Sequence, residues 1–272
     1  FVVYSDNRGS NTTHREVLEA IAKVKPEIII NLGDIVFISK KYGTMAHFKK
    51  DVEECYGDFD GFVKIFYPAI GGHEERYYNQ SQYPPEGKEP DNTAGRKFYD
   101  EVRLKERVIA FNEEYGDYYF QHRNVHFIIL YRSDEWEFHE KQVKWVEGIL
   151  AKIKDNEPVI VAGHAGGWFY PTSKRQKEIV QLLKKYNVDI ALAADWHDYY
   201  ADVDGNMMRF RSGSAGWGDA VFIKFGVTDK GFVIKALKPD GVTPFGDAED
   251  TGSQYPCWVK KFEEQGQKVP CE

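Results

Sequence analysis

The chain has 272 residues, enough for one large domain with a complete hydrophobic core, and it contains no run of the roughly 20 apolar residues that a membrane-spanning helix needs. Its net charge of −7 argues against nucleic acid as a non-specific partner, because binding a phosphate backbone requires clustered lysine and arginine.

The N-terminal part of the chain is predicted to form a strand–helix–strand unit. Residues 1–5 form an apolar strand, Thr13 and Glu16 form a capping box that opens a helix, and residues 28–32 form a second apolar strand. Such a unit makes the two strands parallel, with a right-handed crossover between them. A further helix is expected within residues 44–63.

The middle of the chain has a third apolar strand and then a long irregular segment. The strand covers residues 65–70, and residues 75–105 are rich in Pro, Tyr, Glu, Asn and Gly without a helical or strand period. We expect this segment to be a loop or cap inserted over one face of the domain. Two strands, over residues 118–121 and 125–131, follow it.

The second half of the chain alternates helices with strands and then becomes rich in strands. Gln142 to Ile153 carry a helical apolar stripe, and Ser173 and Gln176 open a second helix. The strands predicted here are residues 159–162, 189–193, 207–212, 221–227 and 232–237. The pattern predicts an α/β fold over residues 1–240, a four-layer α/β/β/α sandwich of two mixed sheets flanked by helices.

Residues 241–272 are predicted to form a C-terminal tail that contains two of the three cysteines. A disulfide between Cys257 and Cys271 would hold this tail in place, and two free thiols are the equal alternative. A bridge would favour an exported protein, either periplasmic or extracellular.

Five of the predicted strands end in Asp or His. The residues that follow these strands are Asp6, Asp34, His73, His164, Asp195 and His197. Carboxyl ends of strands in an α/β sheet meet at one crevice, where ligands bind. Asp and neutral His suit Zn, Mn or Fe, and two such ions about 4 Å apart can clamp a phosphoryl group. Any one of these residues alone is more typical of a turn, but five strand ends together predict a shared functional site.

Taken in order, these segments resemble the motifs of the calcineurin-like metallophosphoesterases, including the purple acid phosphatases. The family pattern runs Asp-x-His, Gly-Asp, Gly-Asn-His-Glu or Gly-Asn-His-Asp, His, and Gly-His-x-His. The matching segments here are Asp6-Asn7-Arg8, Gly33-Asp34, Gly71-Gly72-His73-Glu74, Gly163-His164 and Ala194-Asp195-Trp196-His197. The likeness covers roughly residues 1–237.

The resemblance implies a site for one or two divalent metal ions, which could be Mn, Zn, Fe or Ca. Asp6 and His197 would bind the first metal, His164 would bind the second, and Asp34 would bridge the two. His73 would act as a general acid or orient the substrate.

Three positions depart from the family pattern. Arg8 replaces the His of the first motif, Gly72 replaces the Asn of the third, and Asp195 replaces the first His of the last. Asp195 can still bind a metal, but Gly72 has no side chain to do so and Arg8 is permanently cationic. Each metal position thereby keeps three candidate ligands, and three ligands plus water suffice for a catalytic site.

Other side chains near these motifs are candidates for substrate binding. The guanidinium of Arg8 suits phosphate oxygens, and an ordinary surface ion pair is the equal alternative. Trp168 and Trp196 follow His164 and Asp195 in the chain and are predicted to contact the substrate, although aromatic residues also pack loops.

The leading hypothesis is a metal-dependent hydrolase of phosphomonoesters or phosphodiesters that uses metal-activated water. His73 and Arg8 would be its catalytic residues, and a small phosphoester would be its substrate. The alternatives are a degenerate member of the fold, with a binding or structural role and little or no catalysis, and a one-metal variant enzyme. Nothing in the sequence identifies the substrate, the metal or the oligomeric state.

Overall fold

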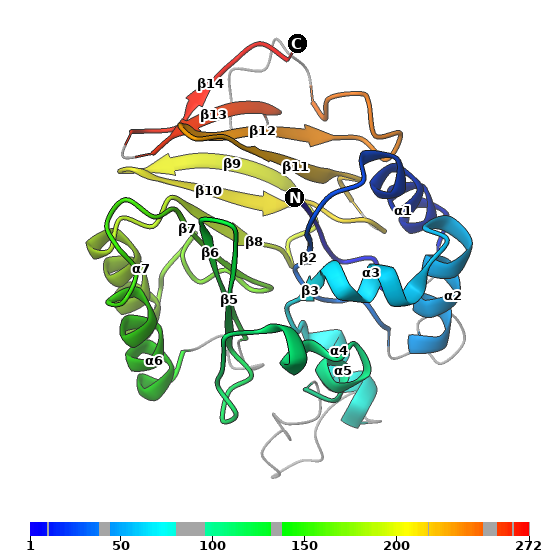
Figure 1. Cartoon of the computed structure of the whole chain (residues 1–272), viewed down its shortest axis with the longest axis horizontal. Helices are drawn as coiled ribbons and strands as arrows, with labels where there is room; N and C mark the ends of the chain where they lie inside the picture. The colour runs from blue at the N-terminus through cyan, green and yellow to red at the C-terminus, as the bar shows by residue number, and fades with distance from the viewer. Residues whose placement is uncertain are drawn as a thin grey trace.

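Two seven-stranded sheets form the centre of the molecule (Figure 1). Among the described residues, every helix is too short or too polar to span a lipid bilayer. The computed structural model describes residues 1–9, 11–37, 44–79, 96–131, 138–216, 218–246, 255–262 and 264–271.

The first sheet has the strand order β14-β13-β12-β11-β1-β2-β3. The first two strands in the chain are parallel, as predicted, the third is parallel to them as well, and the others pair antiparallel. The strands are β1 (Val2–Tyr4), β2 (Ile29–Asn31), β3 (Phe66–Pro68), β11 (Phe222–Val227), β12 (Gly231–Leu237), β13 (Cys257–Lys261) and β14 (Gln267–Lys268).

The second sheet has the strand order β4-β5-β6-β7-β8-β10-β9. Its four central strands are parallel, and antiparallel strands lie at both edges. The strands are β4 (Ala110–Phe111), β5 (Tyr118–His122), β6 (Val125–Leu130), β7 (Val159–Gly163), β8 (Ile190–Ala193), β9 (Tyr199–Asp204) and β10 (Met207–Ser212).

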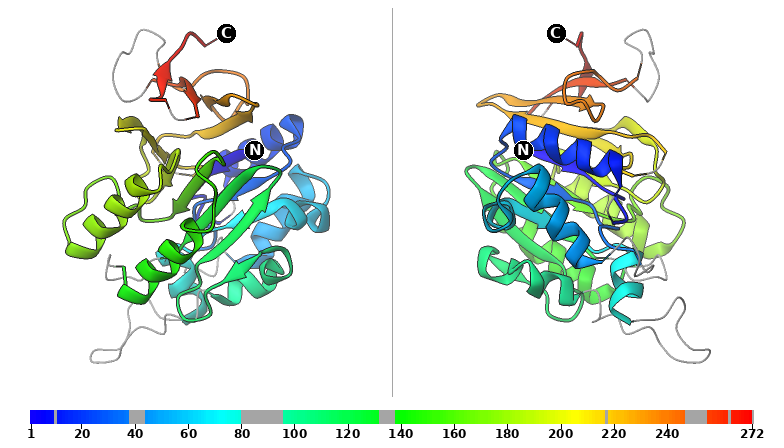
Figure 2. Two further views of the ribbon diagram at one scale, coloured as in Figure 1. Left: turned by 60° about the vertical axis from the view of Figure 1, so that its left-hand side comes forward. Right: turned by 90° about the vertical axis from the view of Figure 1, so that its right-hand side faces the viewer.

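Helices flank the two sheets on opposite sides (Figures 1 and 2). Helices α1 (Thr12–Val24), α2 (Met45–Cys55) and α3 (Phe59–Ile65) lie beside the first sheet, and α6 (Glu140–Leu150) and α7 (Lys174–Lys185) lie beside the second. The predicted four-layer fold of two mixed sheets is therefore confirmed.

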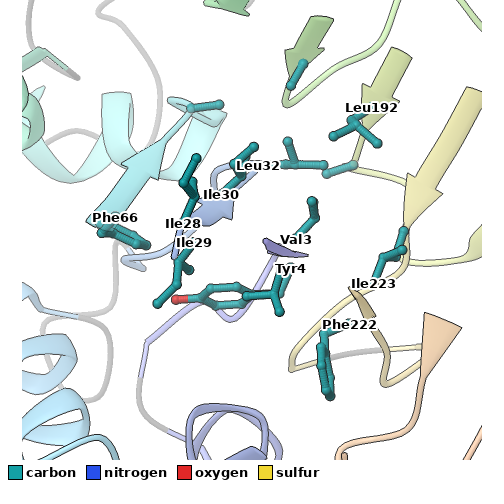
Figure 3. Packing of buried hydrophobic residues seen from close by; sticks show 14 of the residues in the cluster. Val3, Tyr4, Ile28, Ile29, Ile30, Leu32, Phe66, Leu192, Phe222 and Ile223 are labelled. Atoms are coloured by element: carbon teal, nitrogen blue, oxygen red, sulfur yellow. The ribbon is translucent and has the colours of Figure 1, made fainter. Parts of the chain in front are cut away.

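Alternating side chains of the second sheet face two separate cores, because successive residues of a strand point to opposite faces. Phe127 and Leu192 belong to the larger core between the sheets, whereas Ile128 and Val161 pack in a smaller core with residues of α6 and α7. Figure 3 shows part of the larger core, with Val3 of the first sheet and Leu192 of the second among its residues.

Some local predictions need correction. Helix α1 begins at Thr12, and its N-cap is Asn11, whose side chain accepts a hydrogen bond from the backbone N–H of His14. The predicted capping box at Thr13 is therefore wrong, whereas the one at Ser173 and Gln176 is confirmed.

The irregular segment predicted at residues 75–105 is partly helical. Its described parts contain the end of α4 (Gly72–Asn79), then α5 (Lys97–Glu101) and the start of a 3-10 helix (Leu104–Arg107). Residues 80–95 lie outside the described residues. The helix predicted within residues 44–63 is in fact two helices, α2 and α3, because Asp58 caps a new helix.

The C-terminal tail extends the first sheet. Strand β13 pairs with β12, and a disulfide joins Cys257 to Cys271. Cys257 and Trp258 are buried. Of the two alternatives, disulfide or free thiols, the structure thus has the disulfide, and it joins the two ends of the segment that carries β13 and β14.

We expect Cys271→Ser to lower the free energy of unfolding by about 3 kcal/mol, because opening this short loop restores chain entropy to the unfolded state. Urea unfolding under oxidising conditions measures the change. Cys55→Ser is the matched control, because Cys55 is a free thiol. Equal stability of Cys271→Ser and the wild type would show that the bridge contributes nothing.

Candidate metal centre

Strands from both sheets bring the predicted metal ligands to one place. Asp6 and Asp34 follow β1 and β2, whereas His164, Asp195 and His197 follow β7 and β8. The Nε2 atom of His164 lies 3.4 Å from Asp34 Oδ1 and 3.5 Å from Asp195 Oδ1. The Nε2 atom of His197 lies 3.2 Å from Asp6 Oδ1. The five side chains therefore lie together at the carboxyl ends of the strands.

Three of these residues have the geometry of a metal centre. Asp6, Asp34 and His164 are buried, and each offers a ligand atom within 4.8 Å of the other two. Two carboxylates so deeply buried need a compensating positive charge. Asp6 Oδ1 and His197 Nε2 face each other, and neither has a hydrogen-bond partner among the described residues. The residues present therefore fit a divalent cation.

His164 is oriented by a hydrogen bond on the far side of its ring. Its Nδ1 donates to the backbone carbonyl of Leu32 at 2.7 Å, which leaves Nε2 directed at the carboxylates. Burial alone would lower the pKa of His164, but the charge of Asp34, the hydrogen bond to Asp195 and the charge of Asp6 raise it well above its usual value. The neighbouring carboxylates therefore favour the cationic form of this ring.

The backbone of the site is strained. Among the described residues, nine other than glycine have a positive φ, and five of them belong to this site. They are Asp6 (51°), Arg8 (45°), Asp34 (57°), Asp195 (76°) and His197 (58°). Such conformations cost about 1–3 kcal/mol each and persist where the surrounding structure enforces them. Strained backbone of this kind is typical of functional sites, and here it is concentrated among the candidate ligands.

Glu74 fixes the loop that carries Asp34. Its Oε2 accepts the backbone N–H groups of Asp34 at 2.9 Å and Gly71 at 2.8 Å, and its Oε1 accepts those of Ile35 at 2.6 Å and Val36 at 2.9 Å. Burial and the charge of Asp34 raise the pKa of Glu74 to about 7. A side chain at position 71 would lie 2.3 Å from Asp34 Oδ1, so this close approach requires glycine.

Arg8 and His73 lie on one side of the Asp34 carboxylate. Arg8 Nη2 is 3.1 Å and His73 Nε2 is 3.6 Å from Asp34 Oδ2, and the ring of His73 stacks on Phe37. Burial raises the pKa of Asp34, but the charges of His164, His73 and Arg8 lower it below its usual range. Arg8 thus forms the ion pair that was one of the two alternatives, but its partner is a buried carboxylate, since Asp34 is 2% exposed and Arg8 is 21% exposed. Gly72 begins α4 and offers no side-chain ligand.

The two predicted substrate-binding tryptophans lie in different environments. Trp168 is fully buried in the core beside α6 and α7, and its ring stacks on Phe138. The prediction that Trp168 contacts the substrate is corrected, because a ring without exposed surface supports the loop instead. Trp196 is 40% exposed and lies in the chain between Asp195 and His197.

Sequence reasoning missed an amide pair that supports the metal centre. Asn31 accepts the backbone N–H of Gly33 and donates to Asn7, and Asn7 in turn donates to the carbonyl of Ile35. The signal was Asn31 itself, a polar residue in an otherwise apolar strand. A cavity of about 550 Å³ lies elsewhere, beside Phe1, and none of the candidate metal ligands lines it.

Comparison with protein families matches residues 1–199 to the calcineurin-like phosphoesterases. Comparison with curated proteins gives no significant match.

Several solved structures share the fold. The purple acid phosphatase PPD1 of yellow lupin aligns at a TM-score of 0.66 and 14% identity, over 90% of this chain but only 52% of its own. A dimetal phosphatase of Danio rerio aligns at 0.66 and 10% identity, over 97% of this chain and 99% of its own. GAP50, the anchor in the inner membrane complex of Plasmodium, aligns at a TM-score of 0.58 and 16% identity, over 97% of this chain and 89% of its own. At these identities the likeness concerns the fold alone.

Proposed function

The chain belongs to the calcineurin-like phosphoesterase family, and we propose that it is a metal-dependent hydrolase of small phosphomonoesters or phosphodiesters. The observation that carries this proposal is the buried set of Asp6, Asp34 and His164, whose ligand atoms lie within 4.8 Å of one another. Two carboxylates and one imidazole suit Zn, Mn or Fe.

The proposed centre assigns a task to each residue. Asp6, Asp34 and His164 would hold a metal, with Asp195 and His197 as further ligands, and this metal would act as a Lewis acid and activate water. Arg8 is 21% exposed and would bind the phosphate oxygens that approach Asp34. His73 would protonate or orient the leaving oxygen.

A direct assay tests the proposal. Purified protein is incubated with p-nitrophenyl phosphate and with bis(p-nitrophenyl) phosphate, each with added Mn, Zn, Fe or Ca. Metal-dependent turnover of either ester is the expected result. The absence of turnover with all four metals would overturn the hydrolase assignment.

The position of Arg8 favours a one-metal form of this enzyme. Its guanidinium is 3.1 Å from Asp34 Oδ2, where the family carries a neutral imidazole. A permanent cation repels a second metal at that oxygen and can supply part of its charge toward phosphate. Elemental analysis should then find one metal ion per chain, and two ions per chain would exclude this form.

A second candidate function is a binding or structural role with little or no catalysis. The same Arg8–Asp34 pair supports it, because an ion pair already compensates the central carboxylate. GAP50, which shares the fold, is described as an anchor. A protein that binds no metal and hydrolyses neither ester would favour this candidate.

An exported location, periplasmic or extracellular, is also proposed. The disulfide between Cys257 and Cys271 supports it, because such bonds persist in oxidising compartments. Alkylation of free thiols in protein taken directly from its native cells tests this point. Protection of both cysteines is expected, and their complete alkylation would contradict export.

A further inference from the structure

An aromatic platform lies on the loops that follow the proposed metal ligands and on the start of β9. We define it as Phe169, Tyr170, Trp196 and Tyr200, whose rings surround the guanidinium of Arg211 on β10. The distances from Arg211 Cζ to the four ring centroids are 5.5, 5.9, 5.3 and 4.5 Å, in that order. All four rings lie within 6 Å of one guanidinium and therefore form a cation–π cluster.

Arg211 holds the platform in a fixed position. It is only 6% exposed, and its Nη2 donates to the carboxylate of Asp198. A second guanidinium, that of Arg209, lies 5.4 Å from the ring of Phe169. Because folding already orders these rings, a ligand that contacts them loses little further conformational entropy to side-chain ordering.

The outer two rings of the platform face solvent. Tyr170 is 59% and Trp196 is 40% exposed, whereas Phe169 is 5% exposed. Tyr170 and Trp196 meet edge to face, with 6.4 Å between their centroids and an interplanar angle of 77°. The exposed part of the platform is therefore a rigid pair of rings that offers aromatic surface to a ligand.

The exposed pair belongs to the same two chain segments as three of the proposed metal ligands. Trp196 stands between Asp195 and His197 in the chain, and neighbouring Cα atoms are about 3.8 Å apart. Tyr170 follows His164 by six residues on the loop after β7. A phosphoester bound at the metal centre would thus have an aromatic surface beside it.

We propose that Tyr170 and Trp196 bind the aromatic ring of an aryl phosphoester substrate, with Arg211 as a positioning residue that holds them in place. This inference rests on the proposed function, because it assumes that a phosphoester binds beside these rings. Stacking recognises the flat face of an aryl group, and an alkyl ester of the same charge lacks that face.

Equilibrium binding tests the inference without requiring turnover. Isothermal titration with added Mn²⁺ compares phenylphosphonate with methylphosphonate, two stable phosphonates that differ in the ring. Wild-type protein is expected to bind phenylphosphonate about tenfold more tightly, which is a typical gain from one aromatic stack. Tyr170→Leu is expected to remove most of this preference, because leucine keeps apolar bulk without a flat face.

Two further variants separate the loss of an aromatic ring at the subsite from a general loss of protein structure. Tyr186→Leu makes the same substitution at the C-cap of α7, ahead of the amino end of β8 and so at the opposite end of that strand from Asp195. This variant should keep the full preference for phenylphosphonate. Trp196→Leu should reduce the preference while the bound metal, measured in parallel, stays at the wild-type level.

The outcomes distinguish the two proposals. A preference for phenylphosphonate that Tyr170→Leu retains, or equal binding of both phosphonates by wild type, would overturn the aryl subsite. Preferential binding that depends on Tyr170, without hydrolysis of any ester, would overturn the hydrolase assignment and support the subsite. Failure of wild type to bind either phosphonate would overturn the aryl subsite, whereas only the absence of ester turnover would overturn the hydrolase assignment.

Discussion

Asp34→Ala is expected to lose its bound metal and to hydrolyse phosphoesters at least about 1000-fold more slowly than wild type, because metal catalysis contributes several kcal/mol to transition-state stabilisation. Asp34 faces His164, His73 and Arg8 together, at 3.4, 3.6 and 3.1 Å. Its removal takes away the central ligand and leaves these basic groups without their common partner. Elemental analysis and an ester assay on the same preparation measure both effects.

Two further variants make the Asp34 result interpretable. Asp34→Asn keeps an oxygen that can accept the backbone N–H of His73, so its fold should survive while the charge is lost. Asp60→Ala is the matched control, because Asp60 is 79% exposed and pairs only with Arg103 among the described ion pairs. Wild-type activity in Asp34→Ala would contradict the proposed centre.

Glu74→Gln is expected to weaken metal binding about 10- to 100-fold, the usual effect of removing a group that supports a metal ligand. Each oxygen of Glu74 accepts two backbone N–H groups, and the amide of glutamine can accept at only one oxygen. Two buried donors would lose their acceptor, at a cost of about 1–3 kcal/mol each in unfolding free energy. Metal titration and urea unfolding measure the two consequences.

The matched control is Glu53→Gln, which makes the same substitution at a solvent-exposed position, since Glu53 on α2 is 53% exposed. It should match wild type in metal affinity and in stability. If Glu74→Gln also matched wild type in both, the anchoring role of the Glu74 carboxylate would be refuted.

The positions of several strands along the chain and the convergence of the candidate ligands could be predicted, because both depend on short-range sequence patterns. Apolar runs identified β1, β2, β7 and β8, and the carboxyl ends of such strands meet in α/β folds. Polar residues directly after these strands therefore had to converge. Strand β13 was not predicted, because the C-terminal tail has few apolar residues and shows no clear strand periodicity.

The details of the candidate site depended on contacts that no local pattern encodes. Whether Trp168 or Trp196 faced solvent was decided by packing against residues far away in the chain, such as Phe138 and Arg211. The ion pair of Arg8 with Asp34 likewise joins two loops through tertiary structure. Left-handed backbone at five site residues could not be located from the sequence, although four of them are Asp or His, which adopt it more often than other side chains do.

The central claim is that a divalent metal binds between Asp6, Asp34 and His164. Crystals soaked in Mn²⁺ and measured at the manganese absorption edge would test it most directly, because anomalous scattering locates the ion without any assumption about activity. The account predicts a peak within coordination distance of all three side chains, at about 2.0–2.2 Å from their ligand atoms. A peak elsewhere, or none in fully soaked crystals, would contradict it.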